Sequence, residues 1–260
     1  MRVFIISLGT LIVLGFFLMM TRFWGLNQQY PPLDHVLLKQ DNQPVAVIQA
    51  ETTNEIQNIA KKVPQSWIWL NVRTSADAKI FISNTKENFR RINSQDWKSS
   101  HPDAMTLAEA YQRFPKLVFV LNIMETAPET HLLVIQDTQN HSSDERTVIQ
   151  SDTLSIVKAL KDLKPQWLFG TSRSDLLQLL TMTSVGAGPV AQMSGDLFIA
   201  PLQTMNRPSF DESVLNEVKR RNKWRIIGPL VNDLQVSEAK KWGAEGYIFA
   251  NIELFLNYSH

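Results

Sequence analysis

Nine short apolar runs follow one another along the chain after residue 44, and this alternation constrains the fold more than any other feature. The runs are VAVIQ (45–49), WIWLNV (67–72), KIFIS (79–83), LVFVLNI (117–123), TVIQS (147–151), WLFG (167–170), DLFIA (196–200), WRIIGPL (224–230) and YIFAN (247–251). Amphipathic stretches with a helical spacing of apolar residues, such as TNEIQNIAKKV and DESVLNEVKRRN, lie between most of them. Because alternating strands and helices build βαβ units, we predict an α/β fold with a parallel sheet.

The number of runs favours a closed barrel. The runs at 67–72 and 79–83 are separated only by RTSADA, which is too short for a helical crossover, and we predict a hairpin there. Eight βα units remain, which predicts a (β/α)8 TIM-type barrel. A doubly wound open sheet is the alternative. The sequence has neither GxGxxG after the first strand nor GxxxxGK[ST], so a nucleotide-binding fold gains no support.

The first 26 residues predict a transmembrane signal anchor. Residues 3–21, VFIISLGTLIVLGFFLMMT, carry no charge. As a helix they would extend about 28 Å, close to the ~30 Å hydrocarbon core of a bilayer. A cleavable signal peptide would have a shorter apolar run and a small-x-small cleavage site, which the segment 19–24 does not offer. We therefore predict an anchor over 1–26, a linker over 27–43 and a barrel domain over 44–260, with residues 3–21 contacting the membrane.

Charge and composition indicate the compartment and exclude some partners. Arg2 and the α-amino group precede the apolar run and Arg22 follows it, which favours a cytoplasmic N-terminus and a single-pass protein with its barrel on the extracytoplasmic side. The chain has no cysteine, which excludes disulfides, thiolate metal sites and thiol nucleophiles. Its net charge of +1 gives no reason to expect a nucleic-acid partner.

Five segments, in order, are similar to motifs of the glycerophosphodiester phosphodiesterase family, which belongs with the phosphatidylinositol phospholipase C-like barrels. The segments are WLNVRTSADAKIFISN, MTLAEAYQRFP, LVFVLNIMET, IIGPLVND and WGAEGYIFANIELF, and the likeness covers residues 44–256. The resemblance implies a (β/α)8 barrel that hydrolyses deacylated glycerophospholipids. It also implies a Ca²⁺ or Mg²⁺ ion held by carboxylates, and two histidines as general acid and base.

The residues at the family's site positions lack this chemistry. The positions expected to line the barrel mouth are Gln49, Ala50, Trp69, Asn71, Ser83, Asn84, Met124 and Asn251. None of them is a carboxylate or an imidazole. We therefore predict no catalytic residue, no metal ligand and no cofactor, and a protein that binds or scaffolds a polar small molecule or a protein at the barrel mouth. The alternative is an active metal-dependent phosphodiesterase with a rearranged site.

For several other residues we expect structural roles. Glu51 and Glu125 each lie one position from a family site residue, and strand alternation would aim them away from the mouth. His101 is expected to be a solvated loop residue, and Asn122 a scaffold position that the chain shares with the family. The loop 185–189, VGAGP, is expected to be a plain loop. The basic run 219–223, KRRNK, is expected to be a solvated helix end, with a lipid-headgroup patch as the alternative.

Overall fold

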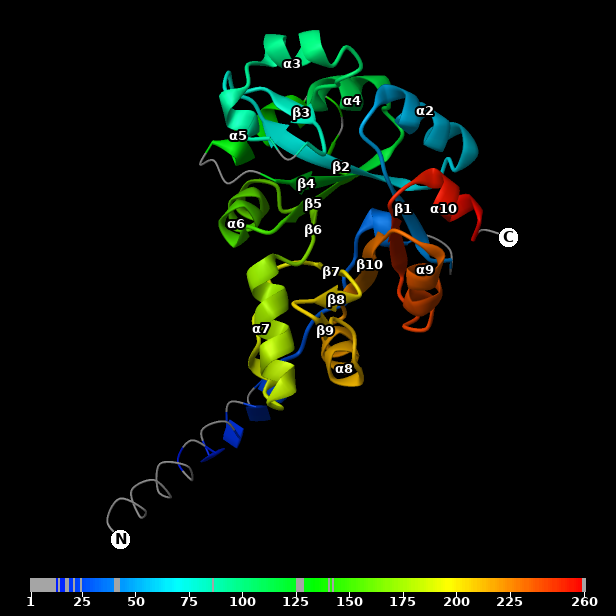
Figure 1. Cartoon of the computed structure of the whole chain (residues 1–260). Helices are drawn as coiled ribbons and strands as arrows, with labels where there is room; N and C mark the ends of the chain where they lie inside the picture. The colour runs from blue at the N-terminus through cyan, green and yellow to red at the C-terminus, as the bar shows by residue number, and fades with distance from the viewer. Residues whose placement is uncertain are drawn as a thin grey trace.

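Eight parallel strands form a nearly closed barrel in the computed structural model of this chain (Figure 1). The structure describes residues 13, 15–16, 19–20, 22–23, 25–39, 43–85, 87–124, 129–139, 141 and 143–258. Around the barrel the strands follow the order β6-β5-β4-β2-β1-β11-β10-β7. Their bounds are β1 Val45–Gln49, β2 Trp67–Thr74, β4 Val118–Ile123, β5 Thr147–Ser151, β6 Leu168–Phe169, β7 Leu197–Ala200, β10 Trp224–Leu230 and β11 Gly246–Phe249.

The ring closes without a ladder between β6 and β7. The backbone N–H of Asp196 donates to the carbonyl of Phe169 at 2.6 Å, and the Asp196 carboxylate accepts from the Phe169 N–H at 3.1 Å. The Lys161 ammonium lies 2.6 Å from the same carboxylate. The Asp196 side chain and one backbone hydrogen bond therefore join β6 to β7, where the strands are too short to form a ladder. The predicted α/β barrel is confirmed as a nearly closed parallel barrel.

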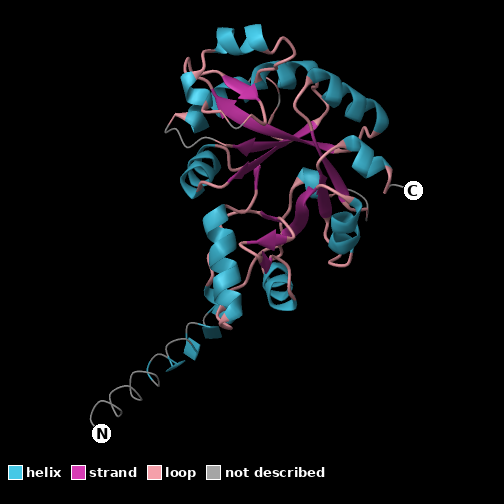
Figure 2. Cartoon of the chain, viewed as in Figure 1, coloured by secondary structure: helices cyan, strands magenta, loops and turns pink. Residues whose placement is uncertain are grey.

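In the described part of the chain, eight helices follow the eight strands and cover the outside of the barrel (Figure 2). Two of them begin with a complete capping box, in which Thr52 and Thr106 each exchange hydrogen bonds with a glutamate three residues on. The helices are α2 Thr53–Lys62, α4 Leu107–Arg113, α5 Thr130–Thr138, α6 Leu154–Leu163, α7 Arg173–Ser184, α8 Glu212–Arg220, α9 Asp233–Lys240 and α10 Ile252–Leu256.

The predicted hairpin is also present. Strand β3 (Ile80–Ile82) pairs antiparallel with β2, and Val72 lies opposite Ile82. Helix α3 (Ser94–Ser100) follows β3, with the 3₁₀ turn η2 (Phe89–Arg91) before it. A small second hairpin, β8 (Gln203–Thr204) with β9 (Arg207–Pro208), lies between β7 and α8.

The inside of the barrel is a packed apolar core. Trp67 and Trp69 lie inside it, with 0% and 6% of their surface exposed. The 3₁₀ turn η1 (Val36–Leu38) closes the N-terminal end, because its Leu37 and Leu38 join the same core cluster. The range predicted as a linker therefore contributes two side chains to the barrel core.

The predicted anchor cannot be followed through the structure. Most of residues 3–21 lie outside the described residues. Within the described part of the chain, no helix combines the length and the hydropathy that a membrane crossing requires.

Candidate functional site

Four amide side chains follow the apolar core at the carboxyl ends of neighbouring strands. Each lies two residues beyond an inward-facing core residue, so that strand alternation turns it toward the barrel interior. The four residues are Gln49, Asn71, Asn122 and Gln150. Asn71 pairs in register with Asn122, and Asn122 with Gln150. The floor of the barrel mouth is therefore polar but carries no formal charge.

Asn71 is the centre of a hydrogen-bond network in this layer. Its Oδ1 accepts from Trp69 Nε1 at 3.0 Å and from Asn122 Nδ2 at 2.6 Å. Its Nδ2 donates to Oδ1 of Asn84, on the loop after β3. Asn122 Nδ2 also lies 3.1 Å from the sulfur of Met124. The structure thus joins four of the predicted mouth residues, Trp69, Asn71, Asn84 and Met124, in one network with Asn122, for which the sequence predicts a scaffold role.

Gln150 is a mouth residue that sequence reasoning missed. Its Nε2 donates to the carbonyl of Thr171 at 3.0 Å, and its buried Oε1 has no hydrogen-bond partner in the described chain. A Cβ on Gly170 would lie 1.9 Å from that oxygen, so the glycine leaves the space that the amide occupies. The signal was present in the sequence, because Gln150 stands two residues after Val148, as Asn122 stands two residues after Val120.

A small cavity adjoins this network at the rim. It has a volume of about 340 Å³ and is lined by the end of β1, the β1–α2 loop, one side of α2, the β11–α10 turn with the start of α10, and Asn84. Gln49, Ala50 and Asn251 are the predicted site residues that line it. The Asn251 side chain accepts from Leu254 N–H at 2.8 Å and caps α10. Ser83 does not line the cavity: its backbone N–H donates to the carbonyl of Asn71 at 2.9 Å, and its hydroxyl accepts from the Thr85 N–H at 3.2 Å.

Glu51 also lines the rim cavity, so the expectation that its carboxylate points away from the mouth was wrong. Strand alternation stops applying at this residue because β1 ends at Gln49. Burial, and secondly the charge of Glu55, raise the pKa of the Glu51 carboxyl above its ordinary value. Its Oε1 is buried without a hydrogen-bond partner among the described residues. Glu125, the other discounted acid, lies outside the described residues.

The donor set at the mouth does not suit a hard divalent cation. Ca²⁺ and Mg²⁺ require several oxygen ligands, mainly carboxylates. Here the central oxygen of Asn71 already accepts two N–H groups, and its neighbours are an indole and a thioether. No group of three or more histidine, aspartate or glutamate side chains that could hold a metal occurs in the part of the chain that the structure describes. The imidazole of His101 stacks on Trp97, with ring centroids 3.7 Å apart.

These features define a (β/α)8 barrel with an uncharged amide network at the carboxyl ends of its strands. No model of a known protein family matches the sequence, and no curated protein matches it. Solved structures do match the fold, and many of the most similar ones are glycerophosphodiester phosphodiesterases.

Three of these structures illustrate the likeness. A glycerophosphodiester phosphodiesterase from Thermotoga maritima superposes with a TM-score of 0.62 at 15% identity, covering 84% of this chain and 100% of that chain. A glycerophosphodiester phosphodiesterase from Agrobacterium tumefaciens superposes with a TM-score of 0.59 at 12% identity, covering 82% of this chain and 99% of that chain. A phosphodiesterase from Oleispira antarctica, in complex with the product sn-glycerol-3-phosphate, gives 0.60 at 12% identity, covering 80% and 93%. The chain therefore has the fold of the glycerophosphodiester phosphodiesterases along most of its length.

Proposed function

We propose that this protein is a membrane-anchored, extracytoplasmic barrel that binds the polyol part of a glycerophosphodiester and does not hydrolyse it. The amide network around Asn71 carries the proposal. Amides donate to and accept from hydroxyl groups, which suits a polyol. They neither transfer protons near neutral pH nor neutralise the charge that develops on a phosphoryl group. The phosphodiesterase fold supplies the class of ligand, and the mouth residues argue against the reaction.

Hydrolysis is tested with the full chain in mild detergent and glycerophosphocholine as the probe. We expect no chelator-sensitive release of sn-glycerol-3-phosphate with millimolar Ca²⁺ or Mg²⁺. General acid–base catalysis alone is worth about 10²–10⁴ in rate, and metal-type stabilisation adds several kcal/mol. Calorimetry with the same compound should nevertheless detect binding. Chelator-sensitive turnover would contradict the inactive state, and the absence of binding would contradict the choice of ligand.

One observation favours the alternative, a hydrolase with a rearranged site. The half-buried Glu51 carboxyl, with its raised pKa, lies in the rim cavity beside Asn84, where a proton donor could act. Glu51→Gln in the same assay separates the two functions. If turnover is present and the variant removes it, Glu51 belongs to a working site. If neither chain turns over, the non-hydrolytic proposal holds.

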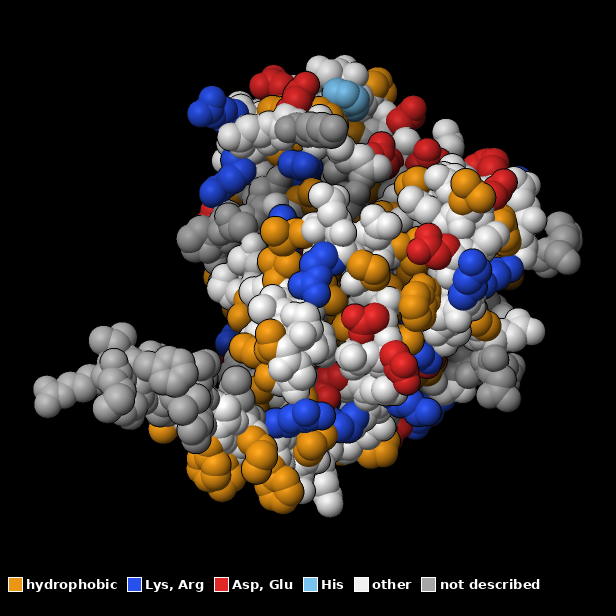
Figure 3. All heavy atoms as spheres, turned by 60° about the horizontal axis from the view of Figure 1, so that its bottom comes forward, with side chains coloured by type: hydrophobic (Ala, Val, Ile, Leu, Met, Phe, Trp, Pro, Cys, Tyr) orange, Lys and Arg blue, Asp and Glu red, His pale blue; other side chains and the backbone are white. Residues whose placement is uncertain are grey.

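The anchoring part of the proposal is supported by the described side chains between residues 13 and 26. Every large apolar side chain described there is exposed, with 48% to 68% of its surface open: Val13, Phe16, Met19, Met20, Phe23 and Leu26. Figure 3 shows a group of apolar side chains (orange) at the lower left edge of the face that it draws. Side chains of this kind are stable in a bilayer, and a cluster of them in water is unfavourable.

Membrane extraction tests the anchor. We expect the full chain to stay with membranes through carbonate and high-salt washes, because an apolar helix of about 20 residues is not released by charge screening. A chain shortened to residues 27–260 should appear in the supernatant. Recovery of mature protein that begins near residue 25 would show a cleaved signal peptide instead.

A further inference from the structure

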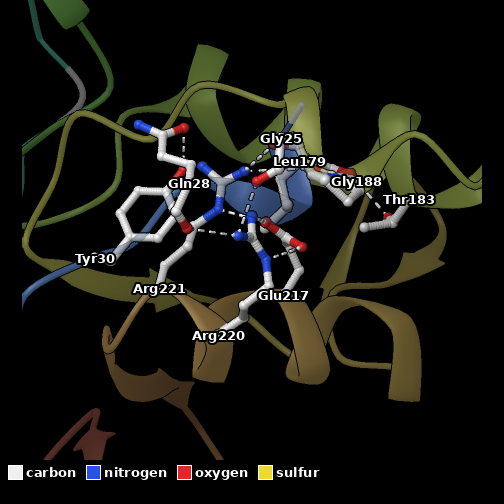
Figure 4. Close-up of polar contacts among 10 residues, drawn as sticks. Gly25, Gln28, Tyr30, Leu179, Thr183, Gly188, Glu217, Arg220 and Arg221 are labelled. Carbon is white, nitrogen blue, oxygen red and sulfur yellow. Dashed lines mark hydrogen bonds and ion pairs between the residues drawn. The ribbon is translucent and has the colours of Figure 1, made fainter. Parts of the chain in front are cut away.

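The chain that follows the apolar run 3–21 is held against the barrel by the end of α8 (Figure 4). Arg220 Nη1 donates to the carbonyl of Gly25 at 3.0 Å and to that of Gln28 at 3.3 Å. Asn222 Nδ2 donates to the carbonyl of Tyr30 at 2.7 Å. Three backbone carbonyls within six residues are therefore bound by two side chains, and this segment is not a free tether.

Glu217 pairs with Arg220, which makes two of these contacts, and with the neighbouring Arg221. Its Oε1 lies 2.6 Å from Arg220 Nη2 and 2.5 Å from Arg221 Nε. Arg221 in turn donates to the carbonyls of Gly188 and Pro189, both at 3.2 Å. We call Glu217, Arg220, Arg221 and Asn222 the clasp. It joins α8, the loop after α7 and the segment 25–30.

Tyr30 and Gly25 complete the contact. The Tyr30 ring lies 5.1 Å from the Arg220 guanidinium and 5.4 Å from that of Arg221, within the range of cation–π attraction. Gly25 packs so closely that a Cβ there would lie 2.5 Å from the Pro189 carbonyl oxygen. Only glycine permits this approach, so the segment is seated in one position on the barrel.

The clasp lies at the end of the barrel opposite the mouth. Helices α7 and α8 return antiparallel to the strands, so their C-terminal ends, Ser184 and Arg220, lie at the N-terminal ends of the strands. Leu37 and Leu38 of η1 close the same end. Figure 1 shows the N-terminal segment leaving beside the lower ends of α7 and α8. The amide network lies at the other ends of the strands.

The surface beside the clasp is both apolar and basic. Phe23 and Val185 each expose 64% of their surface, and Leu26 exposes 48%. Arg22 and Lys219 are exposed with them, and the Arg22 guanidinium reaches to within 3.8 Å of the site of a Gly186 Cβ. Aromatic and aliphatic side chains among cations suit an interface with anionic lipid headgroups.

Only a few residues connect this surface to the predicted membrane span. The apolar run ends at Thr21 and the contacts of the clasp begin at Gly25. Even fully extended, the chain between these two residues spans at most about 14 Å. The base of the barrel must therefore lie close to any bilayer that holds residues 3–21.

We propose that the base of the barrel lies on an anionic bilayer surface and that the clasp holds it there, so that the mouth faces away from this membrane. The proposal rests on the anchoring proposed above and adds an orientation to it. The mouth then takes its ligand from the aqueous phase, as a water-soluble, deacylated polyol compound. An intact phospholipid of the same bilayer cannot reach it.

The absence of cysteine allows a direct test with single-cysteine variants of the full chain. A thiol-reactive fluorophore attached to the Val185→Cys variant lies at the base. The same fluorophore attached to the Leu234→Cys variant lies at the mouth, because Leu234 is in the first turn of α9 and exposes 82% of its surface. The proteins are reconstituted in vesicles of phosphatidylcholine with a minority of phosphatidylglycerol and a headgroup-nitroxide lipid. We expect the label at 185 to be quenched several-fold more than the label at 234.

Equal quenching at the two positions, or stronger quenching at 234, would overturn the orientation while leaving the anchor intact. No quenching at either position, together with release by carbonate, would overturn the anchoring and the orientation with it. Arg220→Gln, introduced beside each label, tests the clasp. We expect the difference between the labels to shrink, and an unchanged difference in a folded variant would show that the clasp does not set the orientation.

Discussion

Replacing Trp67 with alanine is expected to lower the free energy of unfolding by about 3–5 kcal/mol. The side chain is fully buried inside the barrel. It stands in register with Val47 on one side and Val118 on the other. The surrounding strands are tied into a ring, so the walls cannot collapse into the space that the indole leaves. Urea unfolding followed by circular dichroism measures the change.

Trp67→Phe is the matched control. The indole Nε1 of Trp67 is buried without a hydrogen-bond partner in the described part of the chain. Phenylalanine removes this N–H and keeps most of the apolar volume, so we expect a change below about 1.5 kcal/mol. A Trp67→Ala variant that loses less than about 1 kcal/mol would show that the interior is not packed as described.

The barrel could be predicted from the sequence because its signals are local. Each strand appears as a short apolar run, and each crossover leaves room for a helix. The six residues RTSADA between the apolar runs 67–72 and 79–83 exclude a crossover by length alone, and the structure shows β2 and β3 paired as a hairpin there. The count of eight parallel strands follows from these two facts.

The seam of the ring could not be predicted from such signals. Strand β6 is only two residues long, although the run WLFG resembles the others in composition. Closure there depends on Asp196, a single acidic side chain that accepts from a backbone N–H and pairs with Lys161. Nothing in hydropathy distinguishes that aspartate from a solvated one.

The candidate site could be predicted in part from the sequence, and the side-chain positions that could not be predicted have a common cause. Asn71 and Asn84 were assigned to the mouth, but their hydrogen bonds depend on the register between β2 and β4 and on the fold of the loop after β3. The prediction for Glu51 is wrong because this residue lies two positions beyond the end of β1, where strand alternation no longer applies. Residues past the end of a strand follow the loop, and their direction is set by tertiary contacts.

The N-terminal segment gives the clearest case of tertiary control. The sequence around Pro31 and Pro32 predicts a linker, because it has no periodicity. The structure instead binds this stretch through Arg220 and Asn222, which are almost 200 residues away along the chain. A segment without regular structure can still be fixed when its carbonyls meet donors from elsewhere.

Replacing Glu217 with alanine is expected to lower the free energy of unfolding by about 3–5 kcal/mol, because it leaves the buried Arg221 guanidinium without a counter-charge. Glu217 and Arg221 expose only 6% and 4% of their surface. Burial disfavours the ionised form of Glu217, but hydrogen bonds from Arg220 and Arg221 outweigh it and hold the pKa of this carboxyl below its ordinary value. The ionised Glu217 therefore contributes its full stabilisation above about pH 4.5, the ordinary pKa of glutamate in the unfolded chain. This contribution is lost as the pH falls through the lower pKa of Glu217 in the folded protein.

Two control variants distinguish the loss of the buried Glu217 charge from the loss of any carboxylate. Glu238→Ala removes an exposed carboxylate from α9 and should change stability by no more than about 0.5 kcal/mol. Glu217→Gln keeps a hydrogen-bond acceptor beside Arg221 but removes the charge, so its stability should fall less than that of the native chain on acidification. Urea unfolding from neutral pH down to about pH 3 measures both. If Glu217→Ala matched Glu238→Ala at neutral pH, or if the native chain and Glu217→Gln lost stability in parallel, Glu217 would not be the charge that holds the clasp together.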